Sequence, residues 1–347
     1  MKMIEAKSLA QKIAFAPFSF QALKVMIDLG ILKLIDNNFP NGISIKDIEK
    51  KLKLNNYIVS TLLEVALFSN LVELNDNKYN ITKIGQCFLY DTMTKINFNF
   101  VNDVCYQGMF YLKDSFLKSK PEGLKCFGKW KTLYEGLSHF PAKAKKSWFD
   151  FDHFYSDNCF NEVIDIILKD EPACIFDIGC NTGKFETAIF KKGYNKKIVL
   201  MDLKKQLVAA KKNLKKSGKI KNCEFLPINI LNPKLELPQN PTTVLMSQFL
   251  DCFSLNEIVF ILKKVKKVMN KNTKVYILEP FWDKQKFEAA KLSLTHISLY
   301  FTALANGNSK MYSCNEILEC IKKAGLKLSQ IHENIGPFEY TLLECFK

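Results

Sequence analysis

One stretch, Ile175–Gly183, places the strongest limit on how this chain of 347 residues folds. Cys174–Ile178 is a short apolar run with β-branched isoleucines, which favours a buried strand. Gly179 and Gly183 bracket a tight turn, where a missing side chain lets the backbone approach a ligand. Helical spacing over Lys184–Lys192 then aims free N–H groups at whatever lies over the turn. The stretch therefore predicts a strand–turn–helix binding site.

The spacing of this turn narrows the choice of ligand. The dinucleotide fingerprint is Gly-x-Gly-x-x-Gly, whereas this turn is Gly-x-Asn-x-Gly and follows Asp177. The next apolar strand, Lys197–Met201, ends in Asp202, about twenty residues past the turn. An acid at that place can accept hydrogen bonds from ribose hydroxyls. Both signals indicate a nucleoside-containing cofactor other than a nicotinamide or a flavin.

These motifs resemble those of class I S-adenosylmethionine-dependent methyltransferases. The resemblance implies an α/β, Rossmann-like domain with a mostly parallel seven-stranded sheet. It implies S-adenosyl-L-methionine as cofactor, with S-adenosyl-L-homocysteine as product. In this family an amide such as Asn229 lies against the exocyclic amine of adenine, and an aliphatic side chain such as Ile230 lies on its face. The expected cofactor-binding residues are Asp177, Gly179, Asn181, Gly183, Asp202, Leu203, Asn229, Ile230, Ser247, Gln248, Tyr155 and Asp157.

The charge of the chain first suggests nucleic acid as a partner. The formal net charge is +15, and such an excess favours anionic partners. All fifty basic residues are lysine, however, and arginine supplies the forked contacts that most nucleic-acid binders use. The lysines of 211–216 and 263–267 lie on helical patterns with apolar residues between them. We therefore predict solvated helix faces and expect no nucleic-acid partner.

Cysteine use and hydropathy bear on the compartment. Eleven cysteines are scattered without a Cys-x-x-Cys pair or a histidine at metal-ligand spacing. This pattern fits reduced thiols in a cytosol and predicts no metal site. No apolar run reaches membrane-spanning length, and Met1–Ala10 is too polar for a secretory signal. We expect a cytoplasmic protein without a membrane span.

Residues 1–95 read as short helices closed by a hairpin. Gln21–Ile35 is amphipathic, Ser44 can cap a helix beginning at Ile45, and Asn55 or Asn56 can start the next. Two short strands within 71–82, separated by a polar turn, complete a winged helix-turn-helix.

The expected recognition helix of this winged helix argues against DNA binding. Tyr57–Phe68 is nearly uncharged and carries Glu64, which favours a protein–protein role. The region resembles the N-terminal dimerisation domain of metal-independent small-molecule O-methyltransferases. That resemblance implies a homodimer whose N-terminal domain closes part of the partner's substrate pocket.

Residues 96–158 are rich in aromatic side chains, and 159–347 show the α/β alternation of the cofactor domain. Helical packing explains most of the rings, but placed over the cofactor domain they would also wall a pocket for a small aromatic substrate. Within this segment His153, Tyr155 and Asp157 concentrate polar groups among rings. Either His153 is a hydrogen-bonded structural histidine, or this group belongs to the active site.

The segment after the fourth strand of the α/β region carries the expected chemistry. Leu250–Phe253 aligns with the family's Leu-His-Asp-Trp, whose histidine is the general base, so Asp251 stands in its place. A carboxylate with a pKa of about 4 is a poor base for a phenol of about 10 unless burial raises it. Three alternatives stay open: a raised Asp251, a base supplied by His153, or catalysis by positioning alone. Glu279 is either the acid that orients the base or a solvated strand end.

The remaining predictions concern the acceptor. The family often carries a second orienting glutamate where this chain has Met311, and turn formation explains Asn306 and Asn308 as well as substrate binding does. The expected substrate-contacting residues are Phe154, His296, Tyr300, Asn306 and Asn308.

We hypothesise SN2 methyl transfer to the hydroxyl of a small aromatic natural-product or pigment precursor. One alternative is an RNA or DNA methyltransferase, although Ser247–Leu250 lacks the usual Asn/Asp-Pro-Pro-aromatic segment. The other is a winged-helix regulator whose methyltransferase-like domain only senses the cofactor.

Overall fold

The computed structural model describes residues 1–218 and 220–347 and divides into two compact units, Met1–Asn99 and Phe100–Lys347. The sequence suggested boundaries after residues 95 and 158. In the structure the aromatic segment 100–158 is part of the second unit, together with the α/β region. Within the described ranges, no helix combines the length and the apolar character needed to cross a bilayer.

The first unit is helical and contains one hairpin. The predicted helix Gln21–Ile35 is wrong as a single element, because the chain breaks at Gly30, whose φ of +76° suits glycine and not a continuing helix. The elements are α1 Met3–Asp28, α2 Ile31–Asp36, α3 Ile45–Leu52, α4 Asn56–Phe68, β1 Val72–Asn75, β2 Lys78–Ile81, α5 Lys83–Tyr90 and α6 Thr92–Phe100.

The predicted helix starts and the hairpin of this unit are confirmed. The Ser44 hydroxyl accepts a hydrogen bond from the Asp47 backbone N–H at 3.2 Å, and Asn55 Oδ1 accepts one from Ile58 at 3.0 Å. Strands β1 and β2 pair antiparallel around Asp76-Asn77, both with positive φ, as a two-residue hairpin turn requires. Helices, hairpin and a bridge from Ile43 to Tyr79 form the expected winged helix.

The second unit begins with short helices that enclose an aromatic core. Trp148 and Tyr300 are buried there, and the indole N–H of Trp148 donates to the Tyr300 hydroxyl at 2.8 Å. Phe100 stacks on Phe151 with 4.0 Å between ring centroids. The helical elements are a π-helix Val101–Cys105, 3₁₀ turns Gly108–Tyr111, Glu122–Cys126, Leu137–His139 and Asp157–Cys159, and α7 Leu112–Lys118, α8 Leu133–Gly136 and α9 Ala142–Ser156.

The rest of the second unit is a seven-stranded sheet in the order β5-β4-β3-β6-β7-β9-β8. All neighbouring strands up to β7 are parallel, and β9 is antiparallel to both β7 and β8. The strands are β3 Cys174–Ile178, β4 Lys197–Asp202, β5 Cys223–Pro227, β6 Thr243–Ser247, β7 Lys274–Glu279, β8 Lys327–Ile335 and β9 Tyr340–Phe346.

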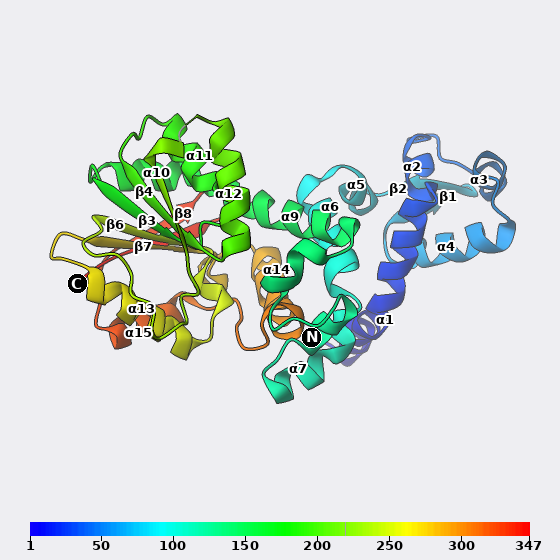
Figure 1. The fold of residues 1–347 in the computed structure, drawn as a ribbon. Coiled ribbons are helices and arrows are strands. Elements are labelled where there is room, and N and C mark those ends of the chain that lie inside the picture. Colours follow the sequence, from blue (N-terminus) through cyan, green and yellow to red (C-terminus); the bar gives the residue numbers. More distant parts are fainter. Residues whose placement is uncertain (219) are drawn as a thin grey trace. The chain divides into compact units, whose positions relative to one another are not determined.

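Helices cover both faces of this sheet, as Figure 1 shows. Ile175 packs in the core beneath α10, α11 and α12, whereas Phe176 and Ile178 pack in the core beneath α13 and α15. Successive side chains of β3 thus pack in two different cores on opposite faces of the sheet, which explains why the strand is apolar along its length. The predicted Rossmann-like α/β fold is confirmed. The helices are α10 Phe160–Leu168, α11 Lys184–Lys191, α12 Lys204–Lys216, α13 Leu255–Val268, α14 Glu288–Tyr300 and α15 Cys314–Ala324.

Candidate active site

The turn between β3 and α11 has the conformation that its sequence predicts. Gly179, Asn181 and Gly183 have φ of +88°, +48° and +76°, a region that glycine and asparagine tolerate. A Cβ on Gly179 would lie 2.3 Å from the ring of Phe249, so no larger residue fits there. The turn is fixed to β4 by a 2.8 Å hydrogen bond from the Gly179 N–H to the Met201 carbonyl. The turn is therefore packed closely against Phe249 and tied to β4.

Asp202 lies beside this turn, at the carboxyl end of β4. Its two carboxylate oxygens accept hydrogen bonds from the backbone N–H groups of Asn181 at 2.8 Å and Leu203 at 2.6 Å. Burial raises the pKa of Asp202 to about 6, although these two N–H groups favour the ionised form. The structure thus brings together three residues that the sequence predicted from two separate strands.

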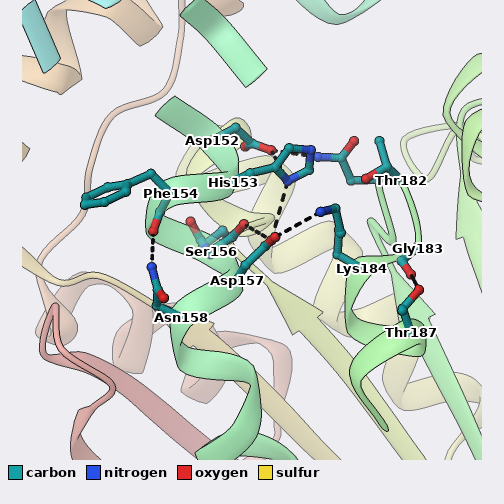
Figure 2. Close-up of polar contacts among 12 residues, drawn as sticks. Asp152, His153, Phe154, Ser156, Asp157, Asn158, Thr182, Gly183, Lys184 and Thr187 are labelled. Atoms are coloured by element: carbon teal, nitrogen blue, oxygen red, sulfur yellow. Dashed lines mark hydrogen bonds and ion pairs between the residues drawn. The ribbon is translucent and has the colours of Figure 1, made fainter. Parts of the chain in front are cut away.

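The end of α9 reaches the same turn (Figure 2). The amide of Asn181 donates to a carboxylate oxygen of Asp152 at 2.9 Å. His153 Nδ1 lies 3.4 Å from Asp157 and 3.9 Å from Asp152, and Lys184 Nζ lies 3.3 Å from Asp157. Asp152 and Lys184 were missed in the sequence, although Asp152 precedes His153 on the same helix. The polar cluster of α9 therefore braces the turn.

Burial and neighbouring charges shift the pKa values of the acidic and histidine side chains in this α9 cluster. Burial raises the pKa of Asp152 to about 6. Burial opposes a charged His153, but the hydrogen bond to Asp157 and the charge of Asp152 outweigh it and raise the pKa of His153. The His153 ring also stacks on Phe149, with 5.8 Å between centroids. His153 is thus held as a partner of two carboxylates.

Two buried acids lie beneath the turn. Asp177 is 2% exposed and Glu186, in the first turn of α11, is fully buried. Neither carboxylate oxygen of Glu186 has a hydrogen-bond partner among the described residues. Burial raises the pKa of Asp177 to about 6, and burial together with the Asp177 charge raises that of Glu186 well above its usual range. At neutral pH this pair holds a proton.

Asp251 lies in the turn after β6 and is 9% exposed. Burial raises its pKa to about 7, against the usual 3.8. Cys252 Sγ lies 3.4 Å from Asp251 Oδ1 and 3.0 Å from the Tyr134 hydroxyl. The position predicted for the base therefore holds a carboxylate with the pKa that such a role needs.

Glu279, at the end of β7, holds the backbone of the segment that carries Asp251. Its Oε1 accepts hydrogen bonds from the N–H groups of Phe249 at 3.0 Å and Leu250 at 2.8 Å. Its Oε2 is buried without a partner among the described residues. Asp251 and Glu279 line one cavity of about 10 Å³, together with Met311, which is about the space of one water molecule. Glu279 is no solvated strand end.

The ends of β3 and β6 leave two more buried polar atoms unpartnered in the described part of the chain. These are Thr182 Oγ1 and Gln248 Nε2. Gln248 follows Ser247 with a φ of +48°, and its Oε1 accepts a hydrogen bond from the Tyr340 hydroxyl at 3.0 Å. Polar atoms left unpaired at the carboxyl edge of a parallel sheet fit the binding of a polar ligand there.

The turn after β5 departs in part from the prediction. Asn229 is exposed, and its Oδ1 accepts a hydrogen bond from the Leu231 N–H at 3.1 Å. Ile230, expected on the face of adenine, is instead 4% exposed and packs in the core beneath α13.

One lysine of α13 also differs from the prediction. The helix face 263–267 was predicted to be solvated, but Lys264 is only 8% exposed. Its place three residues after Ile261 on the buried side of α13 is the signal that was missed.

The residues expected at the acceptor are mostly engaged within the chain. Phe154 packs against Tyr155 and Phe338, and the Tyr300 hydroxyl is bonded to Trp148 in the aromatic core. His296 is exposed on α14 and contacts its own helix, at 2.7 Å from the Leu292 carbonyl.

The two amides expected at the acceptor serve the turn after α14. Asn306 donates to the Cys252 carbonyl at 2.9 Å and accepts from the N–H groups of Asn308 and Ser309. Asn308 itself donates to Glu257 at 3.3 Å. Turn formation thus accounts for Asn306, which also ties this turn to the segment carrying Asp251, and Asn308 is engaged by α13.

Comparisons with known proteins agree with this geometry. Residues 7–79 match the model of a Dimerisation2-like domain, and residues 169–325 match the model of a methyltransferase domain. Residues 169–325 form a methyltransferase domain. The enzyme class predicted from the sequence is confirmed, as is S-adenosylmethionine as the cofactor of that class. No curated protein matches the sequence.

Solved structures share the fold of the whole methyltransferase chain. The mitomycin 7-O-methyltransferase MmcR has a TM-score of 0.74 at 15% identity, over 99% of this chain and 98% of that one. The S-adenosylmethionine-dependent methyltransferase SibL, in its apo form, has a TM-score of 0.71 at 18% identity, over 98% and 99%. The O-methyltransferase NcsB1 from neocarzinostatin biosynthesis has a TM-score of 0.69 at 16% identity, over 94% and 95%, and holds S-adenosyl-L-homocysteine and 1,4-dihydroxy-2-naphthoic acid.

Proposed function

We propose that this methyltransferase transfers a methyl group to the hydroxyl of a small aromatic compound. The observation that carries the proposal is the position of Asp251, a buried carboxylate with a pKa near 7, at the edge of the sheet that holds the cofactor turn. The aromatic core around Trp148 lies in the same unit. NcsB1, which has the same fold, holds a dihydroxylated naphthoic acid, and this supports an aromatic acceptor.

The cofactor lies, in this proposal, over the turn between β3 and α11. Asp202 receives the ribose hydroxyls, while the positive φ of Gly179 and Gly183 gives the turn its shape. The unpartnered Thr182 Oγ1 and Gln248 Nε2 supply further polar contacts. When bound, S-adenosylmethionine supplies a methyl group already activated by its sulfonium charge. The chain contributes orientation and exclusion of water.

The other cofactor residues keep the places that the resemblance gives them. Asn229 lies against the exocyclic amine of adenine, and Tyr155 and Asp157 lie at the methionine end. Asp177, although expected as a contact, is 2% exposed. We therefore assign it to support of the turn from below.

Asp251 is the proposed general base. A base must be ionised to accept the hydroxyl proton, and a pKa of about 7 makes it a far better acceptor than an ordinary carboxylate. His153 is the weaker candidate, because its ring is engaged by Asp157 and its pKa is raised, so that it carries its own proton over more of the neutral range. Glu279 fixes the backbone on which Asp251 stands.

The test is transfer of a labelled methyl group from S-adenosylmethionine to a panel of small phenols. We expect Asp251→Asn to lower kcat by about 10²–10⁴-fold, the usual contribution of a general base. Asp150→Asn, an exposed acid on α9, is the matched control and is expected to keep wild-type activity. His153→Gln is expected to change KM more than kcat, because the residue braces the cofactor turn.

Two results would contradict the proposal. Loss of turnover in His153→Gln with full activity in Asp251→Asn would move the base to His153. Methyl transfer to nucleic acid, with none to any phenol of the panel, would refute the acceptor class.

The first unit is proposed to form a homodimer. The Dimerisation2-like match supports this role, and α1 exposes large apolar side chains, with Ile13 at 78% and Phe18 at 69% exposure. Such a surface favours burial against a second copy. Light scattering is expected to give twice the chain mass of 39.9 kDa. Ile13→Glu is expected to give monomers and the exposed control Lys12→Glu to stay dimeric; a wild-type monomer would refute the proposal.

We also propose a cytoplasmic location. No disulfide joins the cysteines of the described residues, and five of the eleven are exposed or only partly buried. Thiols in that state fit a reducing compartment. Cell fractionation with thiol labelling tests this; oxidised cysteines in the isolated native protein would argue against it.

A further inference from the structure

Lys264 of α13 is a buried lysine whose ammonium group is bound by backbone carbonyls. Its Nζ donates to the carbonyl oxygen of Ile230 at 3.1 Å and to that of Asn232 at 2.5 Å. The ammonium lies 4.9 Å from the centroid of the Phe260 ring. A buried cation needs such partners, and hydrogen bonds from an ammonium to carbonyl oxygens are stronger than neutral ones.

The two carbonyls belong to the turn that follows β5, residues 228–232. The turn is anchored at its other end by the Ile228 N–H, which donates to the Asp202 carbonyl at 2.9 Å. Between these anchors the Asn232 N–H donates to the Asn229 carbonyl at 3.0 Å. Asn229 therefore stands between a fixed point on β4 and a fixed point on α13, and it is exposed.

We propose that Lys264 is a positioning residue for the adenine end of the cofactor. It holds the turn in place, so that the amide of Asn229 faces the exocyclic amine of the base. This inference rests on the proposed function, in which Asn229 lies against that amine. Lys264 does not touch the ligand, and its effect reaches the base only through the backbone of the turn.

The test compares two ligands that differ at one group of the base. S-adenosylhomocysteine carries the exocyclic amine, and S-inosylhomocysteine carries a carbonyl oxygen instead. Isothermal titration calorimetry gives Kd for both with the full chain and with Lys264→Met, which keeps the length of the side chain and removes the charge. Lys263→Met is the control, because it removes the same charge from an exposed place on the same helix.

We expect Lys264→Met to weaken binding of S-adenosylhomocysteine by about tenfold, in line with loss of the neutral hydrogen bond between Asn229 and the base. Binding of S-inosylhomocysteine is expected to change little, so the ratio of the two Kd values moves toward one. Lys263→Met is expected to keep both Kd values within about twofold of the wild type.

Equal loss of affinity for both ligands would overturn the proposal, because a general structural defect does not distinguish the bases. Unchanged affinity of Lys264→Met for both ligands would overturn it too. If Lys264→Met does not fold, Lys264→Gln, which leaves a polar group in the site without the charge, takes its place with the same expected fall in the ratio. Failure of the wild-type chain to bind S-adenosylhomocysteine would refute the proposed function itself, and the inference with it.

Discussion

Glu186 offers a test of the cofactor turn that does not depend on activity. Its carboxyl is fully buried beneath the turn, beside Asp177, and its oxygens lack hydrogen-bond partners among the described residues. Burial and the Asp177 charge raise its pKa well above the usual value. The folded protein therefore keeps a proton that the unfolded chain releases above about pH 4.5. This pair stabilises the fold fully at low pH, and the contribution is lost as the pH rises toward the folded pKa.

The size of this loss of stability can be estimated from Asp177, the partner of Glu186. Burial raises the pKa of Asp177 from 3.8 to about 6, and each pKa unit corresponds to about 1.4 kcal/mol, so Asp177 alone loses about 3 kcal/mol between pH 4 and pH 7. That figure sets the scale for Glu186, whose pKa is also raised by burial. Glu186→Gln removes one of the two acids and leaves an amide that can donate to Asp177. Glu186 keeps its proton in the folded protein, so the substitution forfeits no favourable charge at the start of α11. A gain of a few kcal/mol near pH 8 is expected, which corresponds to several degrees in Tm for a unit of this size.

Calorimetric unfolding between pH 5 and pH 8 measures this. We expect Tm of Glu186→Gln to exceed that of the wild type at pH 8 by several degrees and to approach it at pH 5. Glu162→Gln changes an exposed glutamate in the first turn of α10 and is expected to give no such divergence. A Tm difference for Glu186→Gln that does not depend on pH would refute the account of a shared proton.

Two further predictions concern Asp251 and the segment that carries it. The kcat/KM for methyl transfer is expected to rise with pH through about 7, because Asp251 accepts a proton only when it is ionised. Asp251→Asn is expected to remove this rise. A wild-type kcat/KM that does not change between pH 5.5 and 8.5 would argue against Asp251 as the general base. Glu279→Ala leaves the N–H groups of Phe249 and Leu250 without their acceptor and is expected to destabilise the second unit by about 2–4 kcal/mol in denaturant unfolding. Glu279→Gln, which keeps an acceptor, is expected to lose clearly less; equal losses would show that these bonds contribute little.

Much of the fold was predictable because local signals and tertiary packing agree. The strand at Cys174–Ile178 and the caps at Ser44 and Asn55 were read from short patterns, and the structure has them. Gly30 was the exception: the apolar spacing continues through it, but its backbone enters the left-handed region and the helix ends. Periodicity reports which face is buried and cannot report a change of direction.

Site contacts that depend on the order of the strands could be predicted from the sequence. Contacts between elements that are distant in the sequence could not. Asp202 could be placed beside Asn181 because neighbouring parallel strands end at the same edge. The bond from Asn181 to Asp152 and the burial of Lys264 depend on how α9 and α13 pack, which no local pattern encodes. Tyr300, which was expected at the substrate, has its hydroxyl bonded to Trp148 in the aromatic core, a contact that no local pattern shows.

The most direct test of the account is titration of S-adenosylhomocysteine into the wild-type chain and into Asp202→Asn. We expect clear saturable heat with the wild type. We expect at least about tenfold weaker binding for the variant, because the amide has lost the charged contact to the ribose and accepts only one of the two backbone hydrogen bonds. Absence of heat with the wild type, or equal affinity in the two proteins, would contradict the claim that this edge of the sheet binds the cofactor.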